Sequence, residues 1–233
     1  MSPDPSEPTA RIDREIRPLP APLPAEVLAA RRVLPAKPAG VELVGERVRL
    51  RPYVPADAPE LHAISNGSPV ARLGREIGAY DADELVWRYL FDGPFADAEG
   101  LRRVHDAIAA QPDARTFVVA ERSSGALLGS ISLLANHPAH LKVEIGSIWY
   151  TPAVQRTGVG MEVTTLVANH VFGLGYQRFE WKCNALNLRS RLFATRFGFT
   201  FEGIQEAHLI VKDRRRDTAW FRLLADEWSP AES

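Results

Sequence analysis

Hydrophobic residues recur with two different periods between residues 41 and 228. A period near 3.6 predicts amphipathic helices, whereas polar and apolar alternation, or a short apolar run bounded by turn residues, predicts strands. The first pattern predicts helices over 57–64, 81–91, 97–110, 157–172 and 187–197. The second pattern predicts strands over 46–51, 116–120, 127–134, 142–150, 178–183, 199–211 and 217–224.

Capping and turn residues define the ends of these segments. Asp57 and Glu60 predict a capping box at the start of the first helix. Gly175 and Gly198 follow the last two helices, and a turn over 213–216 is expected to join the last two strands. A run of strands followed by strand, helix, strand, helix and two strands indicates an α+β (mixed α/β) fold.

The first 40 residues differ from the rest in composition. They hold nine of the 18 prolines, at positions 3, 5, 8, 18, 20, 22, 24, 35 and 38. Because proline breaks helices and sheet ladders, we expect residues 1–40 to be an extended or disordered leader, in which only 24–34 could form a short helix. A flexible tail and an arm that docks on the domain both remain open. We expect one globular domain over 41–228 and a short tail over 229–233.

Composition and charge narrow the classes of function. The chain has 28 Lys and Arg against 29 Asp and Glu, so no basic excess indicates a nucleic-acid partner. Cys183 is the only cysteine, which excludes a disulfide framework and a cysteine-based zinc site. His137 and His140 have no obvious third ligand, and we expect no metal. No segment has the pattern of a membrane helix or a signal peptide, so we expect a cytoplasmic protein without a membrane partner.

The segment 155–160, with the sequence QRTGVG, lies between a predicted strand and a predicted helix. Gly158 and Gly160 allow main-chain N–H groups to approach a ligand, and the helix N-terminus adds a partial positive charge, so the segment suits a phosphate. It lacks the Gly-Lys-Ser/Thr end of a nucleotide P-loop, and Val163 stands where a dinucleotide fingerprint has its third glycine. A glycine-rich turn without a ligand remains the alternative.

Positive charge is concentrated in the same part of the chain. Residues 155–196 contain six Lys and Arg against two Asp and Glu, a local net charge of +4 in a chain whose net charge is −1. The cations are Arg156, Arg178, Lys182, Arg189, Arg191 and Arg196, and the acids are Glu162 and Glu180. This distribution suits a small polyphosphate ligand.

The sequence resembles the GNAT superfamily of N-acetyltransferases, in its RimJ/RimL-type branch. QRTGVG resembles the Gln/Arg-x-x-Gly-x-Gly/Ala pyrophosphate loop of that family. Further motifs of the resemblance are VRLRP at 48–52, GSIS at 129–132, EIG at 144–146, Asn184, Asn187, Ser190, FGF at 197–199, FEG at 201–203 and RDTAW at 216–220. The resemblance implies a GNAT-like fold with a central, mostly antiparallel twisted sheet, splayed at a cofactor wedge and flanked by helices.

The resemblance also implies acetyl-CoA as co-substrate. The strands over 142–150 and 178–183 would separate to admit its pantetheine arm. The residues expected to bind it are Ile148, Trp149, Tyr150, Gln155, Arg156, Thr157, Gly158, Val159, Gly160, Asn184, Asn187 and Ser190. Asn187 is equally suited to cap a helix, and the two roles are compatible.

Glu144 stands where several family members place a general base, and Ser190 is the expected general acid. A base serves the reaction because the attacking amine must be neutral. Glu144 could instead hydrogen-bond across the sheet, and that alternative stays open. The family often has a tyrosine that acts as the general acid at the position of Phe193. Because Phe193 cannot donate a proton, Tyr150 and Cys183 are further, weaker candidates for the acid.

These features predict an N-acetyltransferase that transfers an acetyl group directly to a primary amine in a ternary complex. The acceptor is a protein N-terminus or a small-molecule amine, and both remain open, as do a monomer and a homodimer. An acyl-CoA-binding regulatory module without turnover is the alternative.

Three arginines lie on the acceptor side of the predicted site. Arg214, Arg215 and Arg216 could receive an acidic group or face water, and the solvated interpretation is favoured. Side chains that could line the acceptor mouth are His62, Asn66, Trp87, Asn136 and His140.

Overall fold

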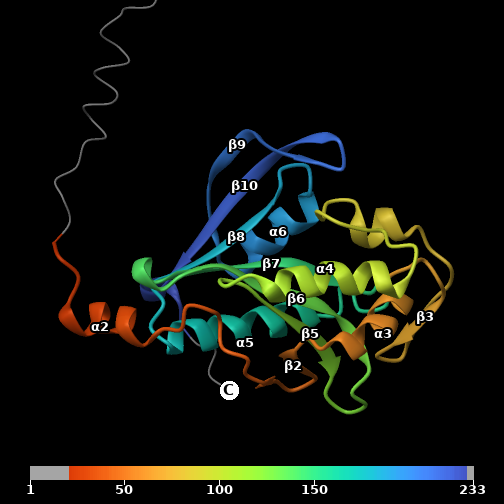
Figure 1. Ribbon diagram of the computed structural model, residues 1–233, viewed down its shortest axis with the longest axis horizontal. Coiled ribbons are helices and arrows are strands. Elements are labelled where there is room, and N and C mark those ends of the chain that lie inside the picture. Colours follow the sequence, from red (N-terminus) through yellow and green to blue (C-terminus); the bar gives the residue numbers. More distant parts are fainter. Residues whose placement is uncertain (1–20, 230–233) are drawn as a thin grey trace, which may run out of the picture.

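Eight strands form one large sheet in the computed structural model, which describes residues 21–229. The strand order is β1-β2-β5-β6-β7-β8-β10-β9, and the β7–β8 pair is parallel in an otherwise antiparallel sheet (Figure 1). The strands are β1 Leu43–Val44, β2 Val48–Pro52, β5 Arg115–Glu121, β6 Leu127–His137, β7 Lys142–Tyr150, β8 Arg178–Asn184, β9 Thr200–Val211 and β10 Arg214–Leu224. The helices are α2 Ala25–Val33, α3 Ala58–Ala63, α4 Ala98–Ala110, α5 Val159–Gly173 and α6 Leu188–Phe197. The expected mixed α/β fold is confirmed.

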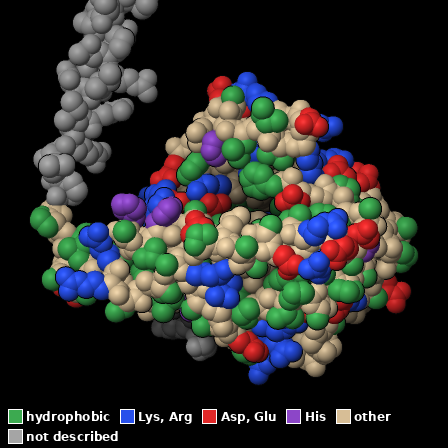
Figure 2. Space-filling view, in the orientation of Figure 1, with side chains coloured by type: hydrophobic (Ala, Val, Ile, Leu, Met, Phe, Trp, Pro, Cys, Tyr) green, Lys and Arg blue, Asp and Glu red, His purple; other side chains and the backbone are tan. Residues whose placement is uncertain are grey.

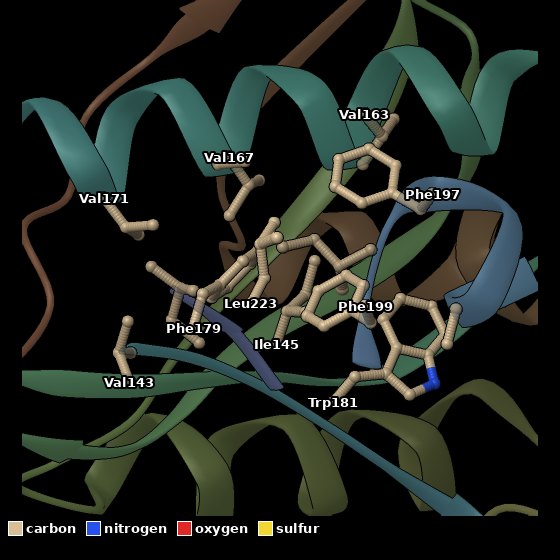
Figure 3. Packing of buried hydrophobic residues seen from close by; sticks show 14 of the residues in the cluster. Val143, Ile145, Val163, Val167, Val171, Phe179, Trp181, Phe197, Phe199 and Leu223 are labelled. Atoms are coloured by element: carbon tan, nitrogen blue, oxygen red, sulfur yellow. The ribbon is translucent and has the colours of Figure 1, made fainter. Parts of the chain in front are cut away.

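Helices cover both faces of this sheet. Val163, Val167 and Val171 are spaced four residues apart on α5 and pack against Phe179 and Leu223 of the strands (Figure 3). Helix α4 lies on the opposite side of the sheet, where α3 joins it. The buried residues of the cluster on that side include Leu61, Ile64, Trp87, Leu101 and Trp149. The hydrophobic periods of the sequence therefore build two cores, one on each face.

Strands β7 and β8 pair only at their beginnings. Their register runs from Lys142 opposite Arg178 to Ile145 opposite Trp181. Beyond Ile145, β7 has a bulge at Ser147, where φ is 49° and the register with β6 shifts. An extra residue in one strand bends that strand and increases its twist. Strand β7 therefore leaves β8, which continues along β10.

The second half of the predicted leader is packed on the domain. Residues Ala25–Val33 form α2, which confirms the short helix expected within 24–34, and Leu34 is 8% exposed. The expectation of extended or disordered chain over 1–40 is therefore wrong for this part, because apolar burial offsets the cost of ordering it. Residues 1–20 of the leader and 230–233 of the tail lie outside the described residues.

Asn136 fixes the chain that follows α2. Its side-chain nitrogen donates to the carbonyl oxygens of Pro35 and Ala36 at 2.8 Å each, and its oxygen accepts the Tyr176 hydroxyl at 2.6 Å. Asn136 is 3% exposed, so these bonds satisfy a buried amide. Asn136 therefore has a structural role and no place at an acceptor mouth.

The predicted capping box is absent from α3. The Asp57 carboxylate instead pairs with Arg51 at 2.6 Å and accepts the N–H of Val54 at 2.9 Å. Glu60 accepts from Arg72 at 3.0 Å and from the N–H of Leu127 at 2.9 Å. Asp57 thus caps the 3₁₀ turn over Pro55–Asp57 that precedes α3, and Glu60 binds partners distant in sequence.

Two further segments differ from their predictions. The helix expected over 81–91 is a π-helical turn over Asp83–Trp87, and the turn expected over 213–216 is confined to residues 212–213, with Arg214 already in β10. A hairpin not predicted from the sequence, β3 Val70–Arg72 and β4 Arg75–Ile77, is too short for a periodic pattern.

No helix within residues 21–229 combines the length and apolar composition needed to span a bilayer.

The docked leader predicts a difference between two neighbouring substitutions. Leu34→Ala should lower the free energy of unfolding by about 2 kcal/mol or more, because Leu34 belongs to the main core. Val33→Ala should change it by less than about 0.5 kcal/mol, because Val33 is 77% exposed. Urea unfolding of both variants checks this, and equal effects would contradict docking of the leader.

Candidate functional site

A cavity of about 400 Å³ opens where β7 leaves β8. Figure 2 shows the hollow beneath the β9–β10 hairpin. Its lining from β7 and β8 includes Glu144, Ile148, Lys182, Cys183 and Asn184, and its lining from α6 and the residue before it includes Asn187 and Ser190. The β7 edge beyond Ile145 has no ladder partner on β8, so its main-chain groups are available to a ligand.

The segment 155–160 forms a tight turn into α5. Gly158 has φ of 86° and Arg156 has φ of 64°, so the chain takes a left-handed conformation twice. Among the described residues, no backbone oxygen accepts the N–H groups of Arg156, Gly158, Val159 or Gly160. These donors, together with the helix N-terminus, make a site suited to an anion.

Side chains from three directions hold this turn in place. Gln155 donates to the carbonyl oxygens of Leu85 at 2.8 Å and Tyr150 at 3.2 Å, so its side chain braces the loop. Arg75 of β4 donates to the carbonyl oxygens of Ala153 and Gln155 at 2.9 Å each. Thr157 donates to the carbonyl oxygen of Val154 at 2.6 Å. The hairpin that sequence reasoning missed thus supports the loop.

Arg47 is a second residue that sequence reasoning missed. It donates to the carbonyl oxygen of Thr157 at 3.0 Å and to Glu162 at 3.1 Å. A Cβ added at Gly158 would lie 3.2 Å from the Arg47 guanidinium. The Arg47 guanidinium therefore lies beside the loop, where its ion pair with Glu162 offsets part of its charge. Its position in a polar and apolar alternation gave no signal of this role.

Phe193 closes the back of the loop. Its ring stacks on Trp181 with centroids 5.2 Å apart, and a Cβ at Gly160 would lie 3.2 Å from it. The same Cβ would lie 3.6 Å from Tyr150, whose buried hydroxyl has no hydrogen-bond partner among the described residues. Burial raises the pKa of Tyr150. Gly160 therefore serves close packing as well as access.

Glu144 belongs to a buried network of charges. Lys182 donates to Glu144 at 2.7 Å and lies 3.1 Å from Glu180. Burial raises the pKa of Glu144, although Lys182 acts against this. Burial acts in the same direction on Glu180, but hydrogen bonding to Arg178 and the attraction of Lys182 outweigh it and lower its pKa to about 2. Glu144 is therefore the stronger base of the two carboxylates.

Asn184, Asn187 and Ser190 lie near one another, between the end of β8 and the first turn of α6. Asn187 accepts the N–H of Ser190 at 3.1 Å and is the N-cap, while Asn184 accepts the N–H of Leu186 at 2.9 Å. Trp181 donates to the Ser190 hydroxyl oxygen at 3.0 Å, so the hydroxyl keeps its own proton to donate. Burial raises the pKa of Cys183, which makes its thiol a poor nucleophile.

The β9–β10 hairpin and the chain after the π-helical turn form the other wall. Tyr89, Leu90 and Phe91 face the hairpin residues across the cavity. Lys212 at the hairpin turn donates to the carbonyl oxygen of Trp87 at 2.8 Å and so joins the two walls. The hairpin residues of the lining are His208, Leu209, Arg216, Thr218 and Trp220.

The three hairpin arginines have different environments. Arg214 and Arg215 are exposed, and Arg215 pairs with Asp217 at 2.7 Å. Arg216 is only 5% exposed and lines the cavity, so the solvated interpretation is wrong for it. Arg216 stands two residues before Thr218 and four before Trp220, which also line the cavity, so strand alternation puts all three on one face. The sequence interpretation placed residue 216 in the turn, outside the strand, and so missed this.

The side chains proposed for the acceptor mouth do not line this cavity. Three of them make hydrogen bonds within the fold. The His62 ring is bonded to the carbonyl oxygen of Phe95, the Asn66 side chain accepts the N–H of Ser68, and the Trp87 indole donates to the carbonyl oxygen of Ser65. Trp149, expected to bind the cofactor, packs its ring against Trp87 with centroids 5.2 Å apart. Only its main chain is available to a ligand in the wedge.

Similarity to known proteins agrees with this geometry. A family model described as an acetyltransferase (GNAT) domain matches residues 47–200. A GCN5-related N-acetyltransferase from Brucella melitensis is 36% identical with a TM-score of 0.73, covering 82% of this chain and 81% of that chain. A probable GNAT-family acetyltransferase from Chromobacterium violaceum is 31% identical with a TM-score of 0.77, covering 91% and 98%. The chain belongs to the GNAT family of acetyltransferases. None of the curated proteins matches it.

A more distant solved structure shares the fold. It is a spermidine N-acetyltransferase from Vibrio cholerae, solved in complex with CoA and spermine. Its identity to this chain is 17% and its TM-score is 0.61, with 78% of this chain and 98% of that chain covered. In the present GNAT domain, β7 and β8 separate and Glu144 lines the cavity between them, while the glycine loop follows the end of β7 outside that lining.

The charge network predicts that the effect of a substitution at Glu180 on the free energy of unfolding depends on pH. At pH values above 4.5, the ordinary pKa of a glutamate, ionised Glu180 stabilises the fold. This stabilisation is lost as the pH falls toward the pKa of about 2 that Glu180 has in the folded protein. Glu180→Gln should therefore lower the free energy of unfolding by up to about 3 kcal/mol at pH 6, with a smaller deficit at pH 3.

Urea unfolding across this pH range checks the expectation. Glu202→Gln is the matched control, because Glu202 also accepts from Arg178 but is more exposed, and its deficit should stay below about 1 kcal/mol. A Glu180→Gln deficit that does not change with pH would contradict this account of the network.

Proposed function

We propose that this GNAT protein is an acetyl-CoA-dependent N-acetyltransferase that acetylates a primary amine by direct transfer in a ternary complex. One observation carries the proposal: the open edge of β7 joins a loop of free N–H groups to a cavity that contains a buried carboxylate. The motifs of the sequence support the RimJ/RimL-type branch. The single, buried thiol of Cys183 suits the cytoplasm.

The chain offers each part of acetyl-CoA a complementary group. The N–H groups of Arg156, Gly158, Val159 and Gly160 suit the pyrophosphate, with Arg47 beside them. The main chain of Ile148, Trp149 and Tyr150 suits the amides of the pantetheine arm, because those amides can complete the broken ladder. Asn184, Asn187 and Ser190 would flank the arm near its reactive end. The co-substrate supplies the activated acetyl group.

Glu144 is suited to remove the proton from the amine. At pH 7 that removal costs about 1.2 kcal/mol for an α-amine of pKa near 7.9 and about 4.6 kcal/mol for a lysine of pKa near 10.4. A buried carboxylate with a raised pKa reduces this cost when it contacts the amine directly or through water. The ion pair with Lys182 favours the ionised form of Glu144, which is the form that accepts a proton.

Transfer then forms a C–N bond and breaks the C–S bond of the thioester. Glu144 takes the ammonium proton first, the neutral nitrogen then attacks the carbonyl carbon, and the sulfur leaves as the C–S bond breaks. The second proton that the nitrogen loses ends on the sulfur, which gives the amide and the CoA thiol. Ser190 can donate a proton to that sulfur, because Trp181 occupies only its acceptor side. A thiol of pKa near 8.5 already leaves readily, so this proton contributes less than the base.

An acyl-CoA-binding regulatory module is the second candidate. Phe193 favours it, because no hydroxyl stands where the family often has a tyrosine. The two functions differ in one respect: only the enzyme needs Glu144 for its effect.

Release of CoA thiol from acetyl-CoA in the presence of an amine panel tests the enzyme directly. Glu144→Gln should lower kcat by about 100-fold with unchanged acetyl-CoA affinity, because loss of a general base typically costs 10²–10⁴ in rate. Glu206→Gln, which changes an exposed carboxylate, is the control and should keep full activity. No thiol release with any amine, despite acetyl-CoA binding, would favour the regulatory module.

The loop assignment predicts an effect on affinity. Gly158→Asp adds bulk and negative charge beside the free N–H groups, and its left-handed φ of 86° disfavours any side chain. Calorimetry should show acetyl-CoA binding at least about tenfold weaker. Gly78→Asp adds the same charge at an exposed glycine with open space around it, and should bind normally. Equal affinity of the two variants would mean that the phosphates bind elsewhere.

A further inference from the structure

Arg216 is a buried cation with no anion of its own. It is 5% exposed, and within the described part of the chain its guanidinium has no carboxylate within 4.0 Å and its Nε has no hydrogen-bond partner. Its Cζ lies 4.3 Å from the centroid of the Phe91 ring, which holds the side chain in position without neutralising it. Buried charges are normally paired with an opposite charge, so we expect a bound ligand to supply the anion for Arg216.

The other charges of the cavity cancel one another. Lys182 contacts both Glu144 and Glu180 and lies 4.2 Å from the centroid of the Trp220 ring. Among the described residues that line the cavity, Arg216 is thus the one charged side chain that contacts no side chain of opposite charge. Burial lowers the pKa of Arg216, but a guanidinium stays protonated at pH 7. The cavity therefore presents one uncompensated positive charge.

A second unsatisfied donor lies on the same wall. The indole N–H of Trp220 is buried without an acceptor among the described residues, and Trp220 lines the cavity. Arginine and indole N–H groups can only donate. A ligand that satisfies this wall must bring acceptors and negative charge, and a carboxylate brings both in the planar geometry that a guanidinium matches.

We propose that the acceptor of this enzyme carries a carboxylate as well as its amine, as a free amino acid does, and that Arg216 binds this carboxylate. The inference rests on the proposed acetyltransferase function and names its substrate class. Glu144 and Arg216 lie on one cavity and are close enough for each to influence the pKa of the other. The amine would face Glu144 while the carboxylate faces Arg216.

The size and surroundings of the cavity favour a small acceptor. Its volume of about 400 Å³ must also hold the acetyl end of acetyl-CoA, and Lys212 ties the hairpin over it to the opposite wall. The phosphates of acetyl-CoA do not explain Arg216, because the loop over 155–160 is not part of the lining. A polyamine, the acceptor class of the Vibrio cholerae enzyme, would be repelled by an unpaired cation.

Kinetics with matched acceptors test the proposal. Free L-amino acids, the corresponding amino acid amides and spermidine are compared by kcat/KM in the wild type, Arg216→Met and Arg216→Lys. Methionine keeps much of the apolar contact with Phe91 and removes the charge. Arg216→Met should lower kcat/KM about 100-fold or more for the preferred amino acid and less than about threefold for its amide, and Arg216→Lys should restore part of the loss.

Arg215→Met is the control, because Arg215 lies next in sequence but is exposed and paired with Asp217. It should leave the ratio of amino acid to amide unchanged, and acetyl-CoA binding by calorimetry confirms that each variant is folded. Equal loss for the acid and the amide in Arg216→Met, or a wild type that prefers spermidine, would overturn the carboxylate site and leave the acetyltransferase standing. No turnover with any amine would overturn the proposed function as well.

Discussion

The early end of the β7–β8 ladder determines the rest of this site. Backbone N–H and C=O groups rarely stay buried without partners, so two adjacent strands that separate inside a domain create a place that a ligand must complete. The bulge at Ser147 turns β7 away while β8 follows β10, and the cavity opens between them. The loop over 155–160 follows the end of β7, and α6 follows the end of β8. Binding and chemistry both follow from one interruption of hydrogen bonding.

Electrostatics divides that opening into two parts. On the loop side, N–H groups, the α5 terminus and Arg47 gather positive character near the surface, where a polyphosphate remains partly solvated. On the cavity side, charges are buried, so each one needs a partner. Lys182 satisfies the two glutamates, and Arg216 is left for the acceptor. The even charge balance of the whole chain conceals this division.

The parts of the fold that depend on local sequence could be predicted. Helix α5 follows from three valines at helical spacing, and the Asn187 cap and Gly198 end define α6. The glycine loop could be found because its chemistry lies within six consecutive residues. What depends on distant contacts could not be predicted. Glu60 binds Arg72 and Leu127 in place of its own helix terminus, Asn136 binds a proline-rich segment far away in sequence, and Arg47 binds the glycine loop at Thr157. Each outcome is a competition between local and distant partners that no single segment reveals.

Hydrogen–deuterium exchange with and without acetyl-CoA tests most directly whether the open β7 edge is the binding element. Saturating acetyl-CoA should slow exchange within residues 146–150 and at the N–H groups of Arg156, Gly158, Val159 and Gly160, and leave β1 and β2 unchanged. The first segment has no ladder partner on β8, and those loop N–H groups have no backbone acceptor among the described residues. Bound acetyl-CoA that leaves both segments unprotected would contradict the account and place the co-substrate elsewhere.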